Sequence, residues 1–219
     1  MRQIFLDTET TGLKPPDHRV IEIGCIEVID RKITGNQFHY YINPRRSIEA
    51  SAFAVHGIDE QKLADKPFFE DVAQALITFL EGSEVLIHNA AFDVGFLDSE
   101  FNHAGLSTQM SDMCEIVDTL KVARKLRPRQ KNSLDALCQA YAVSNAHRTL
   151  HGALLDAELL ADVYLAMTAG QNQFDVNLDQ HAQGPQSTHV VKDVRRHKKI
   201  IQPTAAELAA FKRFQEEHA

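Results

Sequence analysis

Two short, uninterrupted apolar runs constrain the fold of this chain more than any other feature. Ile4–Leu6 leads directly into Asp7, and Val85–Ile87 leads directly into His88. A continuous apolar run of this length, rich in β-branched and aromatic residues, is typical of a strand buried on both faces of a sheet. We therefore predict two central strands, each followed by polar side chains.

Further strands are predicted near the N-terminus. Residues 20–29 partly alternate apolar and polar side chains, and residues 38–42 are aromatic and β-prone. Residues 31–36, which separate them, are polar and contain Gly35, so this segment is predicted to be a turn. Together with Ile4–Leu6, these patterns predict three antiparallel strands at the start of the fold.

Apolar residues at spacings of three and four predict the helices. The pattern begins after Pro67, recurs from Phe92 to Phe101, and is longest from Gly152 to Met167. Asp118 and Ser133 each stand where the N-cap of a further helix is expected.

The composition changes after Gly170. Residues 171–191 are rich in Gln, Asn, Asp and His and have few apolar anchors, which is typical of a linker, and a basic cluster follows at residues 192–199. Residues 203–218 predict a short amphipathic helix that is too short to be stable alone. The predicted organisation is a folded domain over residues 1–170, a flexible linker over 171–202 and a terminal helix over 203–219.

Bulk composition restricts the class of protein. The apolar fraction is 44% and the charged fraction 24%, as in ordinary globular proteins. No apolar run approaches the ~18 residues that a membrane span needs, and an acid at position 7 leaves no room for a signal peptide's apolar core. We therefore expect a cytoplasmic protein without membrane contact.

The net charge and the cysteines exclude other classes. A net charge of −7 argues against tight, unaided binding of duplex DNA, but not against phosphodiester chemistry in which cations mediate the contact. The three cysteines are scattered and form no CxxC pair, so they predict buried thiols and not a zinc site or a disulfide framework.

Two acids stand at the end of the first predicted strand. Asp7 and Glu9 are two positions apart, so their side chains point to the same face of a strand. At about 4 Å and an effective dielectric constant near 20, two such charges repel by about 4 kcal/mol. Divalent cations, or protonation of one acid, would offset this repulsion. The alternative is an exposed strand end on which both acids are solvated.

A third acid follows the second apolar run. Asp93 lies within the segment His88–Asp93, after a strand and in the first turn of a predicted helix. Ligands of α/β sheets commonly bind there, and the helix dipole keeps a carboxylate ionised. The alternative is that Asp93 only stabilises the helix N-terminus.

A histidine and a fourth acid lie near the start of the longest predicted helix. His151 and Asp156 are five residues apart, about 500° around a helix, so they would not share a face of it. Both can reach one site if His151 lies in the loop and the helix begins near Gly152. An imidazole with an ordinary pKa of about 6.5 suits a general base at neutral pH. The alternative is a hydrogen-bonded structural histidine.

Four motifs, three of which carry these residues, resemble the DEDDh exonuclease superfamily in order and spacing. The motifs are DTETTGL (7–13), VHGI (55–58), HNAAFDVGFL (88–97) and HGALLDA (151–157). The wider runs KNSLDALC and RTLHGALLDAELLADVYLAMT are similar to the proofreading epsilon subunits of bacterial DNA polymerase III. The resemblance covers about residues 1–170.

The resemblance implies a fold, a reaction and a cofactor. The fold would be α/β: a ribonuclease-H-like mixed sheet flanked by helices, followed by a flexible C-terminal tail. The reaction would be 3'-to-5' DNA exonuclease cleavage that releases 5'-mononucleotides with two Mg²⁺ or Mn²⁺ ions. By motif, Asp7 would bridge the ions, Glu9 and Asp156 would complete the tighter site, Asp93 would hold the second ion, and His151 would be the general base.

The resemblance also implies substrate contacts. Asp7, Glu9 and Asp156 would contact the substrate as well as the ions, and His56 would lie near the terminal nucleotide. Ser51 stands where the epsilon subunits commonly carry glutamate. A substrate contact is expected at this position, but the side chain at Ser51 departs from the family pattern. For His56 the alternative is a capping or packing role.

Three partners are implied. A single-stranded or frayed DNA 3' end would be the substrate, and the polymerase alpha subunit would bind the terminal helix, unless that helix folds back onto its own domain. The segment 171–178 weakly resembles a sliding-clamp-binding peptide. Two other functions stay open: an RNA-trimming enzyme, which would share all five catalytic residues, and a non-catalytic replisome scaffold.

Overall fold

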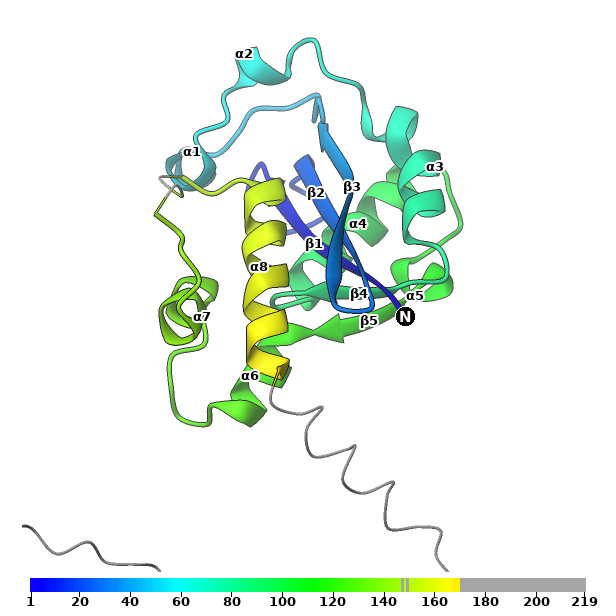
Figure 1. Cartoon of the computed structure of the whole chain (residues 1–219). Coiled ribbons are helices and arrows are strands. Elements are labelled where there is room, and N and C mark those ends of the chain that lie inside the picture. Colours follow the sequence, from blue (N-terminus) through cyan, green and yellow to red (C-terminus); the bar gives the residue numbers. More distant parts are fainter. Residues whose placement is uncertain (147, 149, 170–219) are drawn as a thin grey trace, which may run out of the picture. The chain divides into compact units, whose positions relative to one another are not determined.

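The computed structural model describes residues 1–146, 148 and 150–169 (Figure 1). The predicted linker over 171–202, the terminal helix over 203–219 and the clamp-binding segment lie outside the described residues. Within the described part, no helix is long and apolar enough to cross a bilayer.

The described strands form one mixed sheet in the order β3-β2-β1-β4-β5. β1 is antiparallel to β2, and β2 to β3, whereas β4 runs parallel to β1, and β5 parallel to β4. The predicted α/β class and the three antiparallel opening strands are therefore confirmed. The strands are β1 (Arg2–Thr10), β2 (Val20–Ile29), β3 (Lys32–Tyr41), β4 (Glu84–Ile87) and β5 (Glu115–Asp118).

The turn predicted over residues 31–36 is wrong. β3 already begins at Lys32, and the chain reverses at Asp30 and Arg31, whose φ angles are 49° and 65°. Two consecutive positive φ angles are typical of the tight hairpin turn whose twist matches that of the flanking strands. Residues 32–37, apart from Ile33, carry no large apolar side chain because this half of the edge strand is exposed, and not because it is a loop.

Five of the helices expected from the sequence fall within the described residues, and all five are present: α3 (Phe69–Leu80), α4 (Ala91–His103), α6 (Thr119–Leu126), α7 (Leu134–Tyr141) and α8 (Ala153–Thr168). Both predicted caps are confirmed. Asp118 accepts hydrogen bonds from the backbone N–H groups of Leu120 and Lys121, and the Ser133 hydroxyl accepts one from Ala136. The sequence patterns missed β5 and three short helices, α1 (Ala50–His56), α2 (Glu60–Leu63) and α5 (Met110–Met113).

The alternation of side chains along β1 explains how the two faces of the sheet are covered. Ile4 and Leu6 are buried in the core that contains residues of α3 and α4, whereas Phe5 packs with residues of α8. In Figure 1, α8 crosses one face of the sheet and α4 lies behind it. Because side chains alternate along a strand, Asp7 and Glu9 follow Phe5 toward α8, and Thr8 points toward α4.

Candidate active site

One pocket of about 270 Å³ gathers the four acids and the histidine identified in the sequence. It lies where β1 and β4 end and where α4 and α8 begin. The carboxyl ends of parallel strands are the usual ligand sites of such sheets. The lining residues are Asp7, Thr8, Glu9, His88, Asn89, Phe92, Asp93, Ser133, Leu134, Asp135, Arg148, His151 and Asp156.

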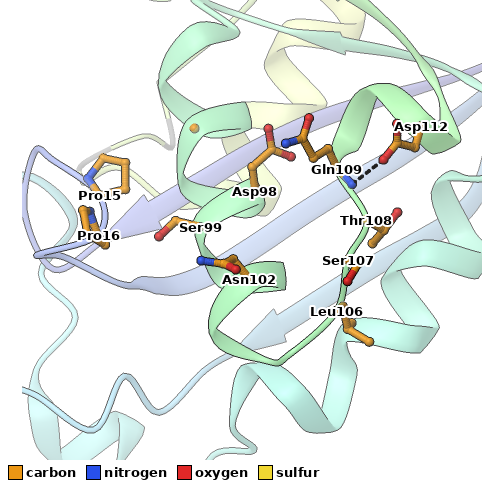
Figure 2. Close-up of a pocket in the computed structure, with 11 residues that line it drawn as sticks. Pro15, Pro16, Asp98, Ser99, Asn102, Leu106, Ser107, Thr108, Gln109 and Asp112 are labelled. Carbon is orange, nitrogen blue, oxygen red and sulfur yellow. Dashed lines mark hydrogen bonds between the residues drawn. The ribbon is translucent and has the colours of Figure 1, made fainter.

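A larger hollow of about 560 Å³ lies beside α4, and Figure 2 shows its polar lining. Its two acids already serve the local backbone. Asp98 accepts a hydrogen bond of 2.7 Å from the N–H of Met110, and Asp112 accepts one of 2.8 Å from the N–H of Gln109. This hollow holds no histidine and only these two acids, whereas the smaller pocket gathers the four acids and the histidine, so the smaller pocket is the candidate active site.

The two acids of β1 are strongly perturbed. Burial, followed by the charges of Asp93, Glu9 and Asp156, raises the pKa of Asp7 well above its usual value. Burial, followed by the charges of neighbouring acids, raises the pKa of Glu9 to about 8. The cluster is therefore unfavourable in its fully ionised form unless a cation compensates it.

Asp93 begins α4 and is held from the opposite face of β1. Its Oδ1 accepts a hydrogen bond of 2.7 Å from the Thr8 hydroxyl and one of 3.1 Å from the Thr8 backbone N–H. Burial nevertheless raises the pKa of Asp93 to about 7, against the lowering effect of Thr8. With Oδ1 engaged, Oδ2 is the oxygen that remains for another ligand.

Asp156 approaches Asp7 because β2 lacks a side chain at one position. Gly24 pairs directly with Asp7 across the two strands. A Cβ at position 24 would lie 2.2 Å from the backbone nitrogen of Leu154, in the first turn of α8. The start of α8 therefore rests directly on the backbone of β2, and Asp156 comes within Coulombic range of Asp7.

The loop position expected for His151 is confirmed. α8 begins at Ala153 with Gly152 as its N-cap, and His151 precedes it with an exposed side chain. His151 Nδ1 lies 3.2 Å from Oδ2 of Asp156, and the His151 backbone N–H donates to the carbonyl of Val55.

Arg148 is the site residue that sequence reasoning missed. Its guanidinium donates hydrogen bonds of 2.5 Å to both oxygens of Asp156 and a further one of 2.7 Å to Asp135. Burial alone would raise the pKa of Asp156, but hydrogen bonds from His151 and Arg148 hold it below its usual value. The available signal was charge balance, since a buried acid cluster needs a cation and Arg148 opens the second of the two wider runs.

His151 Nδ1 has two competing partners. Nη2 of Arg148 lies 2.8 Å from it and can only donate, whereas Asp156 can only accept. The nitrogen is therefore unprotonated when it pairs with Arg148 and protonated when it pairs with Asp156.

The donor set fits a divalent cation. Glu9, His151 and Asp156 each offer one ligand atom, and these atoms all lie within 4.8 Å of one another. Carboxylate oxygens are the ligands that Mg²⁺ and Mn²⁺ prefer, and a cation here would relieve the repulsion among the acids.

Ser51 and His56, both expected near the substrate, do not line this pocket. Ser51 is exposed on α1, where its hydroxyl lies 3.4 Å from a carboxylate oxygen of Glu49. His56 is buried, and its Nδ1 accepts a hydrogen bond of 3.0 Å from the N–H of Ile58. This contact favours the packing role for His56, although its Nε2 has no hydrogen-bond partner within the described part of the chain.

Comparison with known proteins defines the class. The family model described as "Exonuclease" matches residues 4–164, which carry the whole acid cluster. The chain therefore belongs to this exonuclease family, and it is a nuclease with a ribonuclease-H-like fold.

The individual relatives of this chain carry more specific names than the family model. The chain is 49% identical over 221 residues to the DNA polymerase III subunit epsilon of Pasteurella multocida (strain Pm70), covering 95% of this chain and 86% of the relative. It is 44% identical over 218 residues to the subunit of the same name from Escherichia coli (strain K12), covering 95% and 90%. Among solved structures, Exonuclease X in complex with 5' overhanging duplex DNA superposes with a TM-score of 0.63 at 30% identity, covering 78% of this chain and 93% of that one.

Proposed function

We propose that this protein is the proofreading subunit of a replicative DNA polymerase, a 3'-to-5' exonuclease that releases 5'-mononucleotides. One observation carries the proposal: Asp7, Glu9, Asp93, Asp156 and His151, drawn from three separate stretches of the chain, line a single pocket. The names of the relatives supply the polymerase context and, with it, the expected cytoplasmic location.

Two Mg²⁺ or Mn²⁺ ions are the proposed cofactors. Asp7, Glu9 and Asp156 would hold one ion, and Asp7 and the free oxygen of Asp93 the other. Bound divalent ions neutralise the carboxylates and polarise the phosphodiester. The raised pKa values of Asp7 and Glu9 support the proposal, because they reflect a cluster whose charge is not balanced by the protein alone.

His151 is the proposed general base. To take a proton from the attacking water at Nε2, the neutral ring must carry its own proton on Nδ1. The Nδ1–H group then donates a hydrogen bond to Asp156. The 3.2 Å separation of His151 Nδ1 and Asp156 Oδ2 supports this arrangement. It also requires that Arg148 release Nδ1.

The proposed substrate is a single-stranded or frayed DNA 3' end, with Ser51 and His56 near the terminal nucleotide as an expectation from the family motifs. The proposed partners are the polymerase alpha subunit, through residues 203–219, and the sliding clamp, through residues 171–178. The name that the relatives share supports the first of these.

The test is digestion of a mispaired primer by the purified protein with Mg²⁺, with EDTA, and with an Asp7→Ala variant. We expect Mg²⁺-dependent release of 5'-mononucleotides that both EDTA and the substitution abolish. Undiminished activity of Asp7→Ala would show that the site is assigned wrongly.

Digestion of labelled RNA of matched sequence distinguishes the RNA-trimming alternative from the DNA proposal. An enzyme that degrades only RNA would contradict the DNA proposal. The scaffold alternative predicts no hydrolysis by the wild-type protein and unchanged partner binding by Asp7→Ala.

A further inference from the structure

A dense basic segment adjoins the candidate active site. Six of the 23 lysines and arginines of the chain lie within residues 121–131, and no Asp or Glu interrupts them. The rest of the chain is strongly acidic, since the whole carries a net charge of −7. A nucleic acid strand would therefore find local attraction here on a protein whose net charge is negative.

This segment borders a cavity of about 790 Å³ that adjoins the active-site pocket. The two cavities share the lining residues His88, Asn89 and Ser133, and the second extends from them to Arg124 and Arg129. A nucleic acid strand that left the acid cluster along this cavity would pass Arg124 and Arg129, which line it.

The loop that carries Arg129 is fixed to the end of β4. His88 Nε2 donates a hydrogen bond of 2.9 Å to the carbonyl of Asn132, while His88 Nδ1 lies 3.0 Å from the Thr119 hydroxyl. Asn132 in turn donates to the carbonyls of Arg127 and Gln130. The basic loop is thus positioned by the same strand end that carries the pocket, which preorganises it for binding.

Some cations of this segment are bonded within the protein, and others are left to bind a ligand. The Arg127 guanidinium is used internally, by the Gln130 side chain at 2.9 Å and the Lys131 carbonyl at 3.2 Å. Arg124, Lys125, Arg129 and Lys131 are exposed and form no ion pair with any residue that the structure describes. Of these, Arg124 and Arg129 line the cavity. Exposed, unpaired cations along one path are what a phosphate backbone requires.

We propose that Arg124 and Arg129 bind the phosphates of the DNA strand that lies upstream of the nucleotide being removed. The inference rests on the proposed function, because it names the path of that substrate. The terminal nucleotide occupies the acid pocket, and the preceding nucleotides follow the cavity along α6 and the loop before α7. The contact is electrostatic and independent of base sequence.

The test measures binding separately from hydrolysis. Fluorescence anisotropy with a 5'-labelled single-stranded oligonucleotide in EDTA compares the wild type, Arg124→Gln, Arg129→Gln and the double variant over a range of salt concentrations. For single strands, log K falls with log salt by about 0.7 for each phosphate contact, so each substitution should reduce the slope by about 0.7. At low salt, we expect weaker binding by about three- to tenfold per substitution.

Lys32→Gln is the matched control. Lys32 is exposed and lies opposite Ile29 in the β2–β3 register, and Ile29 lies opposite Arg2 at the start of β1. Lys32 therefore lies at the end of the sheet opposite the pocket. Its loss should leave the salt slope unchanged. A double variant with the wild-type slope and affinity, or a control that weakens binding equally, would overturn the proposed path.

Hydrolysis then separates this inference from the proposed function. A p-nitrophenyl ester of thymidine 5'-monophosphate contains one nucleotide and no upstream strand. The substitutions should lower kcat/KM for an oligonucleotide by more than for the ester. Failure of the wild type to hydrolyse either substrate with Mg²⁺ would contradict the proposed function, while the anisotropy series would still decide the binding surface.

Discussion

The Arg148 guanidinium occupies both carboxylate oxygens of Asp156, the acid that α8 contributes to the candidate active site. The same oxygens are needed by a divalent cation, so the guanidinium and the cation compete for one carboxylate. Arg148 also contacts His151 Nδ1, the nitrogen that must be protonated if the ring is to act as a base. One residue thus opposes two of the arrangements that catalysis needs.

Replacing Arg148 should therefore strengthen metal binding. A hydrogen bond to a charged group contributes about 1.5–3 kcal/mol, so we expect Arg148→Gln to bind Mn²⁺ roughly tenfold or more tightly than the wild type. Isothermal titration calorimetry without DNA measures this directly. Arg45→Gln is the control, because Arg45 pairs with Glu70 outside the pocket. Weaker Mn²⁺ binding by Arg148→Gln would show that the guanidinium supports the metal site.

The stability of the protein should depend on pH with an unusual sign. The pKa values of Glu9 and Asp93 are raised to about 8 and about 7, whereas carboxyl groups of an unfolded chain titrate near 4. The folded state therefore binds more protons than the unfolded state between these values. This contribution to stability is complete below about pH 4 and is lost as the pH rises to about 8.

Chemical denaturation in EDTA between about pH 5 and pH 9 measures this loss. We expect the free energy of unfolding to fall as the pH rises, with a smaller fall in Glu9→Gln, which cannot ionise. Added Mg²⁺ or Mn²⁺ should restore stability most at the alkaline end, because the ions bind ionised carboxylates. The lowered pKa of Asp156 acts below pH 4 and leaves this window unaffected. A stability that rises with pH in EDTA would contradict the interpretation of the cluster.

The sequence predicted the central part of this fold because the relevant signals are local. The run Ile4–Leu6 is fully buried, as its continuous apolar sequence predicts. Asp118 caps a helix through hydrogen bonds to residues that directly follow it in the chain. The edge strand β3 was partly mistaken for a turn because its exposed half has no apolar alternation to reveal it. The helices α1, α2 and α5 are too short to show a helical period.

The site was predictable to the extent that strand alternation and family motifs place its acids. Asp7 and Glu9 could be assigned to one face from spacing alone. The role of Arg148 could not, because it depends on how the loop before α8 folds over Asp156 and Asp135, which are eight and thirteen residues away. The packing of Gly24 against α8 likewise depends on tertiary structure and leaves no pattern in the sequence.

Two glycines provide a matched test of that packing. A Cβ at Gly24 would lie 2.2 Å from the backbone of α8, whereas a Cβ at Gly95 within α4 meets only Pro15, at 3.9 Å. We expect Gly24→Ala to destabilise the fold by about 1–3 kcal/mol and to reduce nuclease activity, since it pushes Asp156 away from Asp7. Gly95→Ala should stabilise by about 0.5–1 kcal/mol, because alanine favours a helix interior. Thermal unfolding of both variants decides the matter, and equal effects would show that the contact with α8 is unimportant.

The Thr8 hydroxyl offers a last test, because it reaches Asp93 from the face of β1 opposite to Asp7. Its 2.7 Å hydrogen bond lowers the pKa of Asp93, which burial raises to about 7. Thr8→Val removes this donor without changing the shape of the side chain, at a cost of about 1.5–3 kcal/mol to the ionised form of Asp93. Since one pKa unit corresponds to about 1.4 kcal/mol, the acidic limb of the pH–rate profile should move up by about one unit or more. Thr8→Ser keeps the hydroxyl and should keep the wild-type profile, so a profile that shifts equally in both variants would show that loss of this hydrogen bond is not the cause of the shift.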